Sequence, residues 1–72
     1  MSEISNPHAA RPAFAVGDRV EVFDGSTTWF SGTVKRVYQM SDRRGMPLWT
    51  YDVAMDYARN EVITVTHARR AP

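Results

Sequence analysis

Hydrophobic and polar residues alternate along most of this chain. In "RVEVF", residues 19–23, Val20 and Val22 fall on one parity, while Glu21 and Phe23 fall on the other. Alternation with a period of two is typical of a β-strand with one buried face. Similar segments follow in "WFSGTVKRVY", "LWTYDVAM" and "EVITV". We therefore expect four strands, and we expect the final "THARRAP" to form one tight helical turn and a short last strand.

Turn-forming residues separate the expected strands. Asp24-Gly25 opens "DGSTT", Gly45 lies in "QMSDRRGMP", and "DYARN" precedes the fourth strand. Gly32 interrupts the second strand pattern and predicts a bend or bulge there. No window of a dozen residues carries a helical stripe, so the chain predicts an all-β fold. Short strands joined by tight turns favour a small antiparallel barrel or roll of about five strands.

Strand parity also predicts the core. The residues expected inside are Val20, Val22, Val34, Val37, Tyr51, Val53, Val65 and one of Val62 and Ile63. Trp29 and Phe30 are consecutive, so on a regular strand their side chains face opposite ways. Phe30 shares the parity of Val34. The sequence leaves open whether Phe30 packs inside or stands at the mouth of a pocket.

The first residues differ in character from the rest. Residues 1–13 carry Pro7, Pro12 and small residues without periodicity, which predicts a flexible, disordered N-terminal tail. The remaining residues 14–72 predict a single small domain. A domain of this size buries a modest core, and a deep active-site cleft would need a second copy of the chain.

Composition narrows the classes of protein and the compartment. The chain has no cysteine, which excludes disulfides, thiolate zinc sites and a cysteine nucleophile and fits a reducing cytoplasm. No apolar run approaches the roughly 20 residues of a membrane span, and the first residues lack the apolar stretch of a secretory signal. We expect a soluble cytoplasmic protein with no membrane partner.

Charge and chemistry favour binding over catalysis. The net charge is +1, with nine basic and eight acidic residues, unlike the strongly basic balance of a dedicated nucleic-acid binder. The carboxylates are scattered, two histidines far apart make no metal signature, and no glycine-rich phosphate loop is present. We expect no catalytic residue, metal or cofactor. Two arginine pairs are the candidate phosphate contacts: Arg43, Arg44, Arg69 and Arg70.

The ordered pieces "VGDRVEV", "WFSGTV", "YDV", "EVITV" and "RRAP" resemble the Tudor and Agenet members of the SH3-like barrel group over residues 14–72. The resemblance implies a five-stranded antiparallel barrel. It also implies an aromatic cage that holds a methylated lysine or arginine through cation–π attraction. At the positions that match this cage, the chain has the aromatic residues Phe23, Phe30 and Tyr57, whereas the fourth cage position is not aromatic here. Asp56 would offset the repulsion of a cationic guest by Arg59.

A second resemblance points to an enzyme. "SNP" at residues 5–7 and "GDRV" at residues 17–20 are similar to the plasmid-borne type II dihydrofolate reductases, which are tetramers around a central pore. That family builds its pore with a Val-Gln-Ile-Tyr run, and the matching residues 62–65 lack the glutamine and the tyrosine.

The sequence thus predicts a non-catalytic binding module. Its expected binding groove contains Phe23, Trp29, Phe30, Tyr57 and Asp56. A protein or peptide is the first candidate partner. The alternatives are a weak nucleic-acid binder and an oligomeric reductase-like enzyme, the latter requiring association of the chain with itself.

Overall fold

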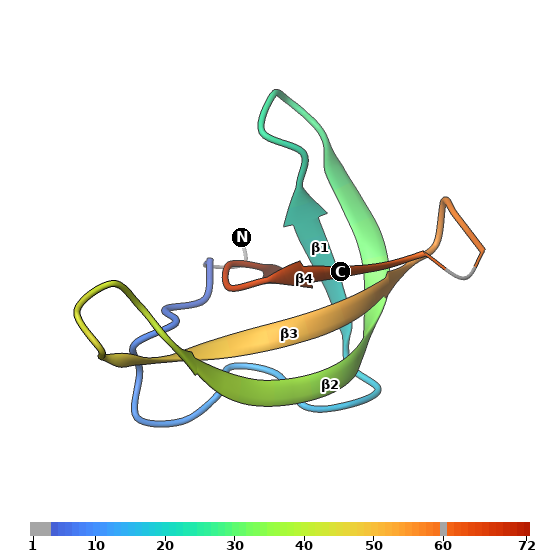
Figure 1. Cartoon of the computed structure of the whole chain (residues 1–72). Helices are drawn as coiled ribbons and strands as arrows, with labels where there is room; N and C mark the ends of the chain where they lie inside the picture. The colour runs from blue at the N-terminus through green and yellow to red at the C-terminus, as the bar shows by residue number, and fades with distance from the viewer. Residues whose placement is uncertain (1–3, 60) are drawn as a thin grey trace.

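The computed structural model describes residues 4–59 and 61–72, and five β-strands make up its regular structure (Figure 1). The strands are β1 (Arg19–Phe23), β2 (Trp29–Ser41), β3 (Pro47–Met55), β4 (Val62–Val65) and β5 (Arg69–Arg70). The described residues contain no helix, so the expected helical turn near the C-terminus is absent, whereas the short last strand is present. No helix able to cross a membrane occurs in this part of the chain either.

All five strands belong to one antiparallel sheet in the order β4-β3-β2-β1-β5. The all-β prediction is confirmed. β2 and β3 form a long, curved hairpin, and β1 crosses beside β2 (Figure 1). β4 and β5 are the two edge strands of the sheet. The turn before β4 follows Met55, and Asn60 within it lies outside the described residues.

The core lies on one face of the sheet. Its buried apolar side chains are Phe14, Val20, Val22, Val34, Tyr51, Val53, Met55 and Ala68. Of the two alternatives on β4, Ile63 is the residue packed against the core, and Val62 is 51% exposed. Ile63 is the register partner of the fully buried Val53, which explains the choice.

The sequence predicts a bend or bulge of β2 at Gly32. The register shift of β2 lies instead between Val34 and Arg36. Gly32 serves a different purpose, because β3 passes very close to it. A Cβ atom there would lie 2.6 Å from Val53 Cγ1 and 2.8 Å from the Ala54 carbonyl oxygen. The missing side chain therefore permits the close approach of β2 and β3.

The N-terminal segment from Ile4 onward is attached to the edge of β5. Ile4 forms a bridge with Arg69, and the Ser5 N–H donates to the Ala68 carbonyl over 2.8 Å. The Ala68 N–H donates in return to Ser5 Oγ over 3.1 Å. The sequence predicts a flexible tail over residues 1–13. Residues 1–3 lie outside the described residues, residues 4–13 contact the sheet, and the flexibility of the tail stays a prediction.

The same segment also reaches β3. The Trp49 N–H donates to the Pro7 carbonyl over 2.7 Å, and Trp49 Nε1 donates to the Ala9 carbonyl over 3.0 Å. Residues 4–9 thus connect the β5 edge with the beginning of β3. On the N-terminal segment both bonds use backbone carbonyls, which explains why no hydrophobic period marks the segment.

Candidate functional site

Phe23 and Trp29 form an aromatic pair where β1 ends and β2 begins. They are direct register partners across the hairpin, and their ring centroids lie 5.2 Å apart with planes inclined at 45°. Side chains at directly opposed positions lie on the same face of a sheet. The pair is therefore a consequence of the hairpin register.

The hairpin turn that sets this register is organised by Asp24. Its Oδ1 accepts hydrogen bonds from the Ser26 N–H at 2.8 Å and from Ser26 Oγ at 2.9 Å, and a longer one from the Thr28 N–H. The Ser26 N–H and hydroxyl, followed by the Thr28 N–H, hold the pKa of Asp24 below its ordinary value. Gly25 has φ of 92°, a conformation that favours glycine.

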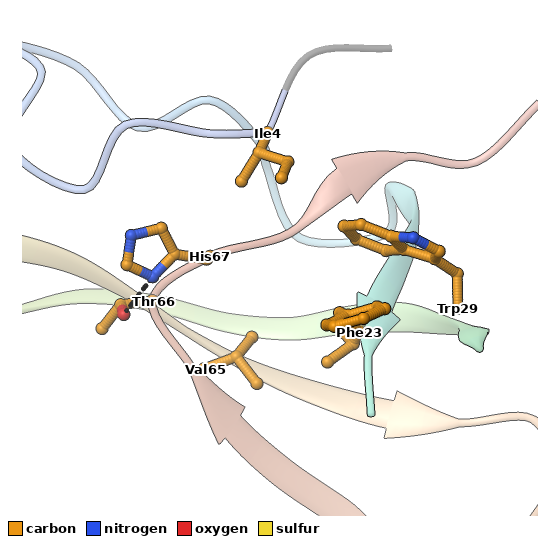
Figure 2. Close-up of a pocket in the computed structure, with 7 residues that line it drawn as sticks. Ile4, Phe23, Trp29, Val65, Thr66 and His67 are labelled. Atoms are coloured by element: carbon orange, nitrogen blue, oxygen red, sulfur yellow. Dashed lines mark hydrogen bonds between the residues drawn. The ribbon is translucent and has the colours of Figure 1, made fainter. Parts of the chain in front are cut away.

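A cavity of about 650 Å³ lies beside the Phe23–Trp29 pair. This volume falls within the range of small-ligand pockets. We call it the Trp29 groove, and its lining residues are Ile4, Val22, Phe23, Trp29, Val65, Thr66 and His67. Figure 2 shows that its walls come from the N-terminal segment, the end of the β1–β2 hairpin, the end of β4 and the link between β4 and β5.

The lining of the Trp29 groove is mainly apolar. Its two polar side chains lie together, since Thr66 Oγ1 and His67 Nδ1 are 3.0 Å apart (Figure 2). The sequence predicts no metal role for His67 and places Ile4 in a flexible tail. No local pattern marks either residue, because both reach the groove through contacts between distant segments.

Arg69 covers the Trp29 ring. Its guanidinium carbon lies 3.9 Å from the ring centroid, and its Nε donates to Glu21 Oε1 over 2.8 Å. Glu21 and Arg69 are register partners on β1 and β5, which explains their pairing. A partly buried arginine held by a ring and a carboxylate is not a free phosphate contact.

Phe30 and Tyr57 form a second aromatic pair, with ring centroids 5.2 Å apart and planes inclined at 55°. Phe30 is the register partner of Val22 and so shares its face, yet it remains 36% exposed. Tyr57 Oη donates to Glu61 Oε1 over 3.2 Å. Partial removal from water, and then the hydrogen bond and charge of Glu61, raise the pKa of Tyr57.

The four aromatic residues predicted from the sequence thus meet as two pairs. Phe23 and Trp29 line the Trp29 groove, whereas Phe30 and Tyr57 do not belong to its lining. Consecutive residues of a strand point to opposite faces, so the two pairs leave β2 in different directions. The Phe23–Phe30–Tyr57 grouping that the Tudor resemblance implies is not assembled around this cavity.

Asp56 is engaged by Arg19. Arg19 Nη1 donates to Asp56 Oδ1 over 2.8 Å, and Arg19 Nη2 donates to Asp56 Oδ2. The hydrogen bonds from Arg19 hold the pKa of Asp56 below its ordinary value and raise the pKa of Arg19. The carboxylate is exposed and lies outside the groove lining, so it serves this ion pair.

The remaining arginines predicted as phosphate contacts lie on two different elements. Arg70 lies on β5, and its Nη1 is 3.7 Å from Asp18 Oδ2. Arg43 and Arg44 are exposed in the loop between β2 and β3, where Asp42 Oδ1 accepts the Arg44 N–H over 2.8 Å. Within residues 4–59 and 61–72, no three histidine or acidic side chains come together in a way that would hold a metal ion.

Comparison of the chain with known protein families, with curated proteins and with solved structures finds no match. The groove, its charges and the sheet topology are therefore the grounds for a proposal about function.

Proposed function

We propose that this chain is a non-catalytic binding module whose Trp29 groove accepts an apolar side chain from a peptide of a partner protein. The observation that carries the proposal is the mainly apolar cavity of about 650 Å³ with two aromatic rings in its wall. Phe23 is 43% exposed there, although a large aromatic residue gains most from burial. Concave apolar surfaces of this kind mark binding sites.

The residue types around the groove support a protein or peptide partner. Tryptophan and arginine are enriched among the residues that contribute most to protein–protein binding, and here Trp29 and Arg69 stand in contact. Ile4 and Val65 add an aliphatic wall that suits a side chain such as leucine or methionine.

We further propose that the sheet belongs to the SH3-like group with Tudor-type relatives. The antiparallel order β4-β3-β2-β1-β5 and the aromatic residue at the end of β1 support this assignment. The absence of cysteine supports a cytoplasmic place of action.

Calorimetric titration with host peptides tests the binding proposal. The peptides have the form Gly-Gly-X-Gly-Gly, with leucine, methionine, phenylalanine or tryptophan at X and glycine as the blank. We expect binding of the apolar series and none of the blank. Trp29→Ala removes a wall of the groove and should weaken binding by at least roughly tenfold.

Tyr57→Ala is the matched control, because Tyr57 is an exposed aromatic residue outside the groove lining. It should leave the affinity unchanged, with circular dichroism confirming that both variants fold. Equal losses in the two variants, or binding that survives Trp29→Ala, contradict the assignment of the groove.

A further inference from the structure

The charges beside the Trp29 groove are already balanced within the chain. Arg69 stacks on the Trp29 ring at 3.9 Å and donates to the Glu21 carboxylate over 2.8 Å. An aromatic face and a carboxylate are the two groups that attract a cationic ligand. Arg69 engages both groups, so its positive charge lies against the Trp29 wall, although Arg69 itself is not among the residues that line the groove.

The cavity itself offers little to a second cation. Among its described lining residues there is no aspartate or glutamate, and its polar groups, Thr66 and His67, lie within hydrogen-bond distance of each other. A cation that entered would lose water without gaining a carboxylate partner. It would also approach a ring that already carries the positive charge of Arg69. An uncharged apolar group meets neither penalty.

We propose, on the basis of the binding function above, that Arg69 determines the specificity of the Trp29 groove. It acts as an internal cation, so the groove accepts an uncharged apolar side chain of a partner peptide and rejects lysine, including methylated lysine. This ligand class is the opposite of the methylated cation that the Tudor resemblance implies.

Two probes that differ only in charge test the inference. One is Gly-Gly-X-Gly-Gly with trimethyllysine at X, and the other carries the isosteric side chain in which carbon replaces the quaternary nitrogen. The wild-type chain should bind the uncharged probe roughly tenfold or more tightly than the charged one. Arg69→Gln vacates the ring and frees Glu21, so the preference should fall to parity or reverse.

Two further variants serve as controls. Arg70→Gln removes the neighbouring arginine of β5, which pairs with Asp18, and should leave the preference unchanged. Arg69→Lys keeps the positive charge and should retain most of the preference. If Arg69→Gln does not fold, the preference of the wild-type chain for the uncharged probe over the charged one tests whether the groove excludes cations.

The inference is overturned if the wild type binds both probes equally or prefers the charged one. It is also overturned if a folded Arg69→Gln variant keeps the full preference. In both cases binding of the uncharged probe leaves the proposed function standing. Failure of the wild type to bind the uncharged probe at millimolar concentration removes the proposed function, and the inference with it.

Discussion

At the scale of single residues, strand parity decides burial wherever one face of a strand meets water. Val20 and Val22 are buried and the adjoining Phe23 is 43% exposed, as their alternation predicts. Parity does not find Phe14 or Ala68, which are buried outside the strand patterns. Phe14 covers Tyr51 edge-on, and Ala68 exchanges hydrogen bonds with Ser5. Such burial depends on how loops dock, which local periodicity does not encode.

Gly32→Ala should destabilise the fold. Its Cβ would lie 2.6 Å from Val53 Cγ1 and 2.8 Å from a backbone oxygen, so β2 and β3 must move apart. We expect the free energy of unfolding to fall by about 1–3 kcal/mol. Urea denaturation measures it, and the neighbouring Ser31→Ala should change it by less than about 0.5 kcal/mol. An unchanged denaturation midpoint for Gly32→Ala would contradict the close approach of the strands.

Two aspartates should titrate at unusually low pH. Hydrogen bonds from Ser26 and Thr28 lower the pKa of Asp24, and those from Arg19 lower the pKa of Asp56. Because the folded pKa lies below the unfolded value of about 3.9, each carboxylate stabilises the fold above that pH. The contribution is lost as the pH falls from about 3.9 through the folded pKa. Carbon NMR of the side-chain carboxyls measures both midpoints.

Arg19→Gln separates the two causes. It should return the midpoint of Asp56 toward its ordinary value and leave that of Asp24 unchanged, because Asp24 depends on its own turn. Movement of both midpoints together, or of neither, would contradict these assignments.

At the scale of elements, the turn residues predict where most strands begin and end. β1 occupies the predicted residues 19–23, and β5 is short, as expected. β2 runs past its expected end at Tyr38 as far as Ser41, because Met40 and Ser41 pair with Leu48 and Pro47 of β3. Pairing with β3 therefore extends β2 into residues whose composition is typical of a turn.

The N-terminal segment contacts the edge of the sheet through Ser5, and Ser5→Ala tests this attachment. Ser5 is 8% exposed, and its Oγ accepts the Ala68 N–H over 3.1 Å. Loss of that acceptor should cost about 1–2 kcal/mol of unfolding free energy and speed hydrogen exchange at Ala68. The groove should also bind its peptide less well, because the neighbouring Ile4 forms part of its wall.

Arg11→Ala is the control for this segment, since Arg11 is exposed. It should leave stability, exchange and affinity unchanged. If Ser5→Ala behaves in the same way, residues 4–9 do not hold the edge of the sheet.

At the scale of the whole molecule, charge pairing decides how the protein meets polyanions. The net charge is +1, and within residues 4–59 and 61–72 four arginines pair with carboxylates: Arg19 with Asp56, Arg36 with Asp52, Arg69 with Glu21 and Arg70 with Asp18. The sequence showed the arginines but not their partners, because these pairs join residues of different elements. The same reason hid the Trp29 groove, of which only Phe23 and Trp29 were predicted.

Binding to a single-stranded oligonucleotide should therefore be weak. Few phosphates can be neutralised when half of the eight arginines pair with carboxylates of the chain, so the affinity should have a shallow dependence on salt concentration. Fluorescence anisotropy across a salt series measures this dependence. Tight binding that declines steeply with salt would favour the nucleic-acid alternative over the peptide-binding module.

The proposed function depends above all on occupation of the Trp29 groove by an uncharged apolar side chain. The chain has two tryptophans, and proton–nitrogen NMR resolves one indole N–H signal for each. During titration with the leucine host peptide, the Trp29 signal should shift. The Trp49 signal should stay, because its N–H is donated to the Ala9 carbonyl away from the groove lining. A shift of Trp49 alone, or of neither signal at millimolar peptide, would contradict the account.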